Sequence, residues 1–204
     1  MSIRIHPTAI VEANVSLGRG TSVWDNVHIR HDATLGEECI VGGKTTIAYG
    51  VAIGNRVKLN SNVYICNGVT IEDGVMVSAG TIFTNDRFPR ATTSDLKQLR
   101  SSDPDEHTQL TRVREGATIG AGCIIGSNLE LGRFSMIGMG SIVTKSVADF
   151  HLVIGTPAKS IGCVCRCGEP IAKWSDGESP GKVTCSACGL SYEVTSRQVR
   201  ELSQ

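Results

Sequence analysis

Four cysteines near the C-terminus have the residue type and the spacing of metal ligands. Cys165-x-Cys167 and Cys185-x-x-Cys188 are each followed by glycine, and seventeen residues separate the two pairs. Thiolates two or three residues apart on a tight turn can bind one tetrahedral Zn²⁺, and four thiolates leave no open position for catalysis. The spacing therefore predicts a structural zinc site. Two alternatives stay open: Cys163 replaces Cys165 as a ligand, or the cysteines form a disulfide or an uncoordinated hairpin.

Residues 84–112 form a second group that could do chemistry. The segment contains one histidine, His107, among many acidic and basic side chains. A guanidinium group matches phosphate oxygens in a bidentate way, so Arg87 and Arg90 are candidates for binding a phosphorylated ligand. The alternatives are a solvated surface insertion, or arginines that form ion pairs with Asp86 or Asp95. Long loops are uncommon unless they are functional or disordered, which favours a functional arm.

A six-residue spacing governs the chain on both sides of this segment. From Ile5 to Val77, and again from Val113 to Val143, every sixth residue is Ile, Leu or Val, and the fourth residue after each is mostly small. This period fits neither an α-helix nor plain strand alternation. It fits a chain that turns a corner after every short strand, so that three hexads close one triangular coil. The pattern predicts an all-β, parallel β-helix over residues 1–160, from which the segment 84–112 is extruded. A β-sandwich would need nineteen coincidental matches.

The composition changes after residue 160, and residues 161–204 are expected to form a small zinc-ribbon-like module. Net charge is zero, and no basic stripe points to nucleic acid. No apolar run is long enough for a membrane span, and the N-terminus does not resemble a signal peptide. We therefore expect a cytoplasmic protein without nucleic-acid or membrane partners, whose eight cysteines are thiols or metal ligands.

The hexads LGRGTS, IGNRVK, IGAGCI and IGSNLE resemble those of the hexapeptide-repeat acyltransferases. The resemblance implies left-handed coils, acetyl-CoA as co-substrate, and a homotrimer with active sites between subunits. The stretches FTNDRFPR (83–90), VWDNVHI (23–29) and KLNSNVYICNGVTIEDGV (58–75) resemble one branch, the N-acetyltransferases of nucleotide-linked amino sugars in bacterial polysaccharide and glycoconjugate pathways. Asp25 stands where that branch has a histidine. The implied reaction transfers an acetyl group to the amine of a UDP- or dTDP-linked sugar.

The resemblance also assigns roles to residues. Asn85, at the FTN position, is expected to hold the reacting amine or a sugar hydroxyl; a turn-capping asparagine is the alternative. His28 falls at a matched position, and a solvated corner residue is the alternative. His107 is a loop histidine, and many hexapeptide acyltransferases outside this branch use a loop histidine as general base, whereas the amino-sugar branch has none that aligns with it. The expected substrate contacts are Asp86, Arg87, Arg90 and Asn62. The backbone at Gly120, Ala121 and Gly138 is expected to receive the coenzyme, with Lys145 and Lys159 at its phosphates.

Two rival functions remain open at this point. The first is O-acetyl or other acyl transfer to a sugar or a small amino compound. The second is a non-catalytic β-helix, either a scaffold or a carbonic-anhydrase-like metal protein. The metal protein would need histidines that share an ion between subunits. His28 and His31 are only three residues apart, and no third suitable histidine lies on the adjoining coils, which disfavours this function.

Overall fold

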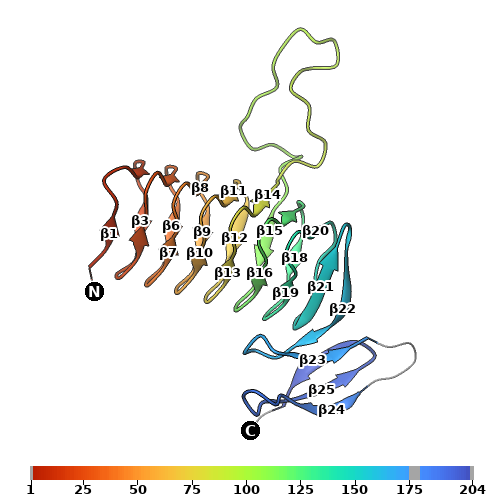
Figure 1. Ribbon diagram of the computed structural model, residues 1–204. Coiled ribbons are helices and arrows are strands. Elements are labelled where there is room, and N and C mark those ends of the chain that lie inside the picture. Colours follow the sequence, from red (N-terminus) through yellow and green to blue (C-terminus); the bar gives the residue numbers. More distant parts are fainter. Residues whose placement is uncertain (1, 175–179, 203–204) are drawn as a thin grey trace.

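The computed structural model describes residues 2–174 and 180–202 as a stack of triangular coils followed by a small cysteine-containing module (Figure 1). Parallel strands pair at an offset of 18 residues, as Arg4 pairs with Ser22 and Lys58 with Met76. This offset is three hexads, so the predicted parallel β-helix is confirmed. The described residues contain no helix, and therefore no helix that could span a bilayer. The left hand of the coils stays a prediction from the resemblance.

Each coil contributes one short strand to each of three faces. Face A, which continues into an antiparallel end, contains β1 (Arg4–Ile5), β4 (Ser22–Val23), β7 (Ile40–Val41), β10 (Lys58–Leu59), β13 (Met76–Val77), β16 (Thr118–Ile119), β19 (Met136–Ile137), β21 (His151–Gly155), β22 (Ala158–Val164) and β23 (Pro170–Lys173). Face B contains β2 (Ile10–Val11), β5 (His28–Ile29), β8 (Thr46–Ile47), β11 (Tyr64–Ile65), β14 (Ile82–Phe83), β17 (Ile124–Ile125) and β20 (Ile142–Val143). Face C contains β3 (Ser16–Leu17), β6 (Thr34–Leu35), β9 (Ala52–Ile53), β12 (Val69–Ile71), β15 (Thr111–Val113) and β18 (Glu130–Leu131).

Three corners connect these faces, and we name them AB, BC and CA after the faces that they join. The last residue of each strand from β1 to β20 points inward, so the hexad aliphatics form one continuous core. Small residues at the fourth position, such as Ala33 and Cys123, are fully buried beside them. Asparagine relieves the bend where the backbone has positive φ, as at Asn26 (52°) and Asn62 (60°). The first coil is the exception, because no coil lies before it: Ile5 is 48% exposed, and Val11 and Leu17 are only partly buried.

The extruded segment leaves the stack at the BC corner, between β14 and β15 (Figure 1). The pairing offset rises there from 18 to 42 residues, as Met76 pairs with Thr118. The additional length is itself a multiple of six, so the hexads resume in register. The loop is slightly shorter than expected, because it ends at residue 110 and not at 112. Thr111 and Arg112 belong to β15, where Arg112 pairs with Thr70 on one side and Glu130 on the other.

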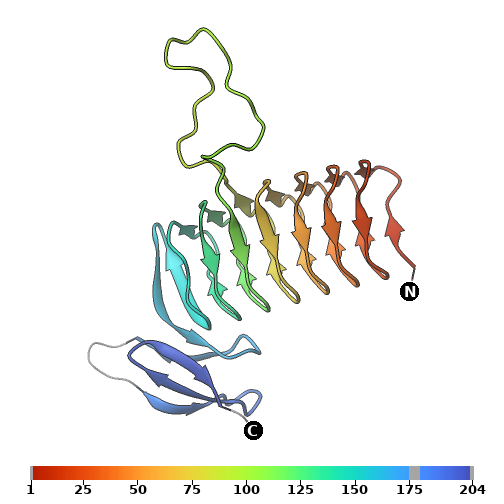
Figure 2. The same cartoon turned by 180° about the vertical axis from the view of Figure 1, so that it is seen from behind.

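The cysteine module lies at the far end of the stack, on the opposite side from the loop (Figure 1, Figure 2). Its own sheet contains β24 (Gly181–Thr184), β25 (Ser191–Thr195) and β26 (Gln198–Glu201). A second hydrophobic cluster joins it to the last coils through three rings: Phe134 stacks on Phe150 at 5.6 Å, and Phe150 meets Tyr192 edge-on at 5.5 Å. The expected boundary at residue 160 falls inside β22, so one continuous strand connects the two cores. The division at residue 160 stays a prediction, and residues 175–179 and 203–204 of the expected module lie outside the described residues.

Candidate active site at the BC corner

Asn85 lies at the BC corner, where the chain leaves the coils. Its side-chain Nδ2 donates to the carbonyl of Asn67 at 3.1 Å, and its own carbonyl accepts from the Gln109 N–H at 2.7 Å. Gln109 is on the returning arm of the loop, so Asn85 joins the two arms at their base. Its Oδ1 has no donor among the described residues, and it could accept an N–H from a bound amine. The turn-capping role and the binding role are therefore compatible.

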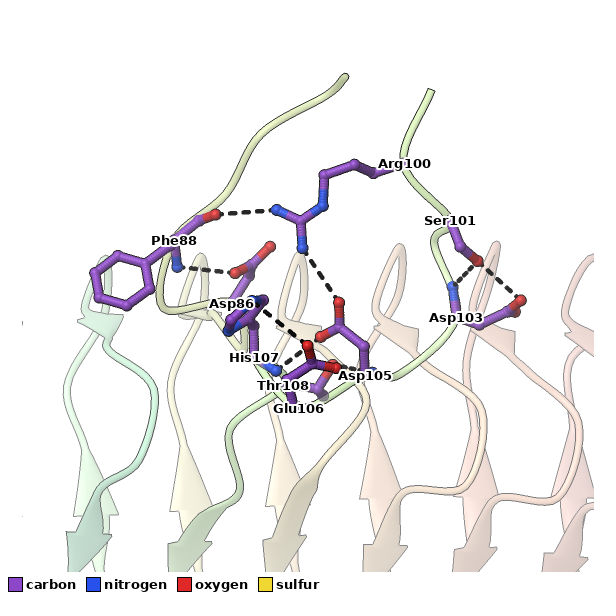
Figure 3. Close-up of polar contacts among 9 residues, drawn as sticks. All are labelled: Asp86, Phe88, Arg100, Ser101, Asp103, Asp105, Glu106, His107 and Thr108. Atoms are coloured by element: carbon purple, nitrogen blue, oxygen red, sulfur yellow. Dashed lines mark hydrogen bonds and ion pairs between the residues drawn. The ribbon is translucent and has the colours of Figure 1, made fainter. Parts of the chain in front are cut away.

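The loop has internal order of its own, as Figure 3 shows. Arg100 donates to the carbonyl of Phe88 at 3.3 Å and to the carboxylate of Asp105 at 3.1 Å. These bonds tie the two arms together above the coil stack. The Asp105 carboxylate also accepts the backbone N–H of His107 at 2.8 Å, and this bond is the largest cause that lowers the pKa of Asp105.

His107 lies on the returning arm near the base of the loop. Its ring meets Phe88 edge-on at 6.3 Å, and its Nε2 is 3.9 Å from the Glu106 carboxylate. Its carbonyl is 3.5 Å from the backbone nitrogen of Arg87, two residues beyond Asn85 in the chain. His107 therefore shares the loop base with Asn85 and stays a candidate base.

The predicted substrate contacts on the outgoing arm are exposed. Asp86 accepts the Phe88 N–H at 2.9 Å, which makes it a turn residue first. Arg87 lies over the Phe88 ring at 5.1 Å, and Arg90 donates only to the carbonyl of the preceding proline at 2.8 Å. Neither arginine has an ion pair in the described part of the chain, so the pairs expected with Asp86 or Asp95 do not form. Both guanidinium groups are available to a phosphate.

His28 belongs to face B, three strand spacings from Asn85. With adjacent strands about 4.8 Å apart, the separation along the stack is about 14 Å, so the two cannot touch one amine within a single chain. Its Nε2 is 2.6 Å from Glu12, whose other carboxylate oxygen accepts the backbone N–H of His31 at 3.0 Å. The bond from His31, followed by that from His28, lowers the pKa of Glu12. His28 is an oriented imidazole, not a solvated corner residue.

The residues predicted for the coenzyme lie mainly at another corner. Gly120, Ala121 and Gly138 are at the AB corner, between β16 and β17 and between β19 and β20. Asn62 lies at the same AB corner, not beside Asn85. A Cβ at Gly120 would lie 2.5 Å from the backbone nitrogen of Met139, so glycine is required there for close stacking of coils. The two lysines separate, with Lys145 after β20 at the BC corner and Lys159 in β22.

A surface groove of about 590 Å³ runs beside the base of the loop on face C. Thr70, Leu110, Arg112 and Glu130 are among its lining residues. Arg112 is held by Glu72, with 2.7 Å between Nε and Oε1.

The four cysteines predicted as zinc ligands converge. The Sγ atoms of Cys165, Cys167, Cys185 and Cys188 all lie within 4.8 Å of one another. Cys163 is fully buried in the adjoining hydrophobic cluster and is not part of this group, so the geometry favours Cys165 over the alternative. A tetrahedral set of four sulfurs is the arrangement that suits Zn²⁺.

Two partners of the candidate residues were not anticipated from the sequence. Glu12 is sixteen residues before His28, close to the 18-residue coil, and coil spacing could have indicated it. Tyr192 is fully buried, its hydroxyl lies 3.1 Å from the Cys165 Sγ, and it accepts the Arg166 N–H at 3.0 Å. Nothing in the spacing points to Tyr192, because it reaches the cysteines through a hairpin fold.

Comparison with known families agrees with the hexapeptide-repeat fold. Residues 14–48 match the model "Bacterial transferase hexapeptide (six repeats)", and residues 32–67, 61–85 and 111–145 match "Hexapeptide repeat of succinyl-transferase". The chain is 35% identical over 97% of its length to dTDP-3-amino-3,6-dideoxy-alpha-D-galactopyranose 3-N-acetyltransferase of Aneurinibacillus thermoaerophilus, covering 94% of that protein. It belongs to the hexapeptide-repeat acyltransferases, in the branch of nucleotide-linked amino-sugar N-acetyltransferases. The serine acetyltransferase of Buchnera aphidicola from Acyrthosiphon pisum is 27% identical over 80% of this chain, which spans only 39% of that protein.

Solved structures share the fold of this family member. GDP-perosamine N-acetyl transferase from Caulobacter crescentus, in complex with CoA and GDP-perosamine, aligns with a TM-score of 0.53 at 20% identity, over 79% of this chain and 57% of the other. AntD, an N-acyltransferase from Bacillus cereus in complex with dTDP and Coenzyme A, aligns with a TM-score of 0.51 at 20% identity, over 81% of this chain and 85% of the other.

Proposed function

We propose that this protein is an acetyl-CoA-dependent N-acetyltransferase that acts on the amino group of a nucleotide-linked sugar. The single observation that carries the proposal is the near full-length similarity to the Aneurinibacillus enzyme, whose name specifies a dTDP-linked amino sugar. The similarity favours dTDP over UDP. None of the eight cysteines, all of which the structure describes, forms a disulfide, which suits a reducing compartment, and we place the enzyme in the cytoplasm.

The chemistry needs little from the protein beyond positioning. The neutral amine attacks the thioester carbonyl, the new C–N bond forms as the C–S bond breaks, and CoA leaves as its thiol while the nitrogen gives up one proton. We assign Asn85 to hold the amine through Oδ1, which has no donor among the described residues. His107, on the same loop base, is the nearer candidate for the base that accepts this proton. His28 is a candidate for that base only if it comes from a neighbouring subunit.

We also propose a homotrimer with shared sites, which the placement of these groups supports. The glycine and alanine backbone expected to receive the coenzyme, at Gly120, Ala121 and Gly138, lies at the AB corner, whereas Asn85 and the loop lie at the BC corner. Face B separates the two corners within one chain, so a second copy would be needed to bring them together. Face B also carries exposed apolar residues, Ile10 (58%), Ile82 (44%) and Ile124 (38%), at outward positions of its strands. Such a row suits packing against another copy.

We also propose a structural Zn²⁺ at Cys165, Cys167, Cys185 and Cys188. The four sulfurs are close enough for one ion, and Tyr192 adds a hydroxyl contact to the Cys165 sulfur. When bound, the metal would cross-link the two cysteine turns and fix the fold of the module. It has no step in the acetyl transfer.

The test is acetyl-CoA-dependent thiol release with a panel of dTDP- and UDP-linked amino sugars. Asn85→Ala, His107→Ala and His28→Ala are measured beside the wild type. Turnover on one nucleotide-linked amine that collapses in Asn85→Ala supports the proposal, and the two histidine variants then show whether a protein base is used. Serine acetyltransferase and galactoside O-acetyltransferase are also relatives of this chain. Turnover of an unlinked hydroxyl compound alone would therefore replace amine transfer by O-acetyl transfer.

A further inference from the structure

A ladder of side chains extends from Asn85 along the BC corner toward the N-terminal coils. Asn85 donates to the Asn67 carbonyl, and Asn67 Nδ2 in turn donates to the Tyr49 carbonyl at 2.9 Å. The Tyr49 ring stacks on His31 with centroids 5.2 Å apart and planes inclined by 8°. These four residues occupy equivalent positions in successive coils. The amine-holding residue therefore stands at one end of a continuous line whose other end is aromatic.

A cation lies at the aromatic end, and a second tyrosine, Tyr64, lies near that cation in the coil next to Asn85. The Arg30 guanidinium is 5.2 Å from the Tyr49 ring centroid, and its side chain is 43% exposed. Arg30 contacts Glu12 only through Nε, at 3.6 Å, so neither Nη has a carboxylate partner among the described residues. Burial raises the pKa of Tyr64, whose phenol also interacts electrostatically with Arg30 and Tyr49. The chain has only three tyrosines, and two of them are here. None of these outward side chains fills the β-helix core.

The ladder is long enough to bind the proposed substrate. From Asn85, Tyr49 is two coils away, or about 10 Å, and Arg30 and His31 are three coils away, or about 14 Å, with the Arg30 guanidinium lying over the Tyr49 ring. In a nucleotide-linked sugar the diphosphate follows the sugar, and the nucleoside follows the diphosphate. In the opposite direction the same corner offers Ser127 and Lys145, and no aromatic ring stands at residues 126–129 or 144–146.

We propose that the nucleotide of the substrate lies along the BC corner toward the N-terminal coils, with Arg30 at the diphosphate and the His31–Tyr49 pair against the base. This subsite rests on the proposed function, because it takes the sugar amine to be held at Asn85. A guanidinium group with free Nη atoms suits phosphate oxygens, and aromatic rings provide a surface for a pyrimidine base. Glu12 fixes the Arg30 stem and the His31 backbone, so both groups are held before the ligand arrives.

The experiment measures binding of free dTDP, of pyrophosphate and of acetyl-CoA to the full chain by titration calorimetry. Arg30→Gln is expected to weaken dTDP and pyrophosphate about tenfold to a hundredfold, as for loss of a charged hydrogen bond, and to leave acetyl-CoA binding unchanged. Tyr49→Ala is expected to weaken dTDP but not pyrophosphate. Arg19→Gln is the matched control, because Arg19 is an exposed arginine at the CA corner with one ion pair, to Glu37 at 3.7 Å.

Two results of the binding experiment would overturn the subsite. One is dTDP affinity that is unchanged in Arg30→Gln and Tyr49→Ala. The other is a loss of dTDP affinity confined to Arg90→Gln, which would place the diphosphate on the loop. If the wild type acetylates a nucleotide-linked amine while Arg30→Gln and Tyr49→Ala keep its KM, the subsite is wrong and the proposed function stands. If the wild type neither binds dTDP nor acetylates any nucleotide-linked amine, the proposed function itself has failed.

Discussion

Replacing Asn85 by alanine should separate the catalytic role of this residue from its structural role. The change removes one hydrogen bond, from Nδ2 to the Asn67 carbonyl, which is worth about 0.5–1.5 kcal/mol. For a chain of this length each kcal/mol lowers Tm by about 2–4 °C, so the variant should stay folded at assay temperature. Loss of an oriented amide at the reacting centre should instead lower kcat by about 10²–10³, as for removal of an oxyanion-hole donor.

The matched control for this prediction is Asn55→Ala at the CA corner. Asn55 also bonds between coils, since its Nδ2 donates to Asp73 at 3.1 Å and its Oδ1 accepts the Glu37 N–H at 2.9 Å. Its loss should therefore cost at least as much stability as the loss of Asn85, and leave turnover intact. Thiol-release kinetics and thermal unfolding are measured on both variants. If activity falls in step with Tm in both, or survives in Asn85→Ala, Asn85 is only a corner residue.

Three further predictions follow from buried polar groups and from the cysteine cluster. Ser135 and Ser141 are both buried at small hexad positions. The Ser135 Oγ has no hydrogen-bond partner among the described residues. The Ser141 Oγ, by contrast, donates to the Gly138 carbonyl at 2.7 Å and accepts the Gly155 N–H. Ser135→Ala should therefore keep or raise Tm, and Ser141→Ala should lower stability by about 1–3 kcal/mol in thermal unfolding. Tyr192→Phe should lower stability by about 0.5–1.5 kcal/mol, because the part-buried Arg166 N–H loses its acceptor, and should speed zinc loss to a chromogenic chelator; an unchanged rate of zinc loss would exclude a role of the hydroxyl in supporting the metal. Elemental analysis should find about one zinc per chain, and its removal should lower Tm, whereas about two per chain would indicate a second, catalytic site.

The repeat made most of the fold predictable from sequence. Each hexad fixes which residue points inward and where the chain turns, and three hexads fix which residues stack in the next coil. The offset of 18 residues even implies that positions such as His31, Tyr49 and Asn67 form a column. The exit of the loop after Phe83 was also visible, because the period fails there. The sequence places the end of the loop two residues too late, because nothing in the hexad pattern indicates that Arg112 pairs with a neighbouring strand.

The candidate site was less predictable, because outward side chains obey no period. Which neighbour an outward group meets depends on rotamers across coils, as for Glu12 and His28, or on the folding of a non-repetitive loop, as for His107 and Phe88. The cysteine pairs are the opposite case. The spacing indicated four ligands but left Cys163 as an alternative to Cys165, and the structure brings Cys165 and not Cys163 together with the other three sulfurs.

The corner positions explain why residues chosen by family resemblance do not form one cluster in this chain. Motif matching orders residues along the sequence, but a triangular coil sends neighbouring hexads to different corners. Asn62 and Asn85 are an example: they are 23 positions apart, which is one coil of 18 plus five residues, or nearly one further hexad, so they lie at different corners, AB and BC. Motif matching therefore groups residues that can approach one another only if they come from two copies of the chain. The column from Asn85 to His31 is different, because its members share one corner in one chain, and a ligand bound along it needs no second subunit to supply its cation or its rings.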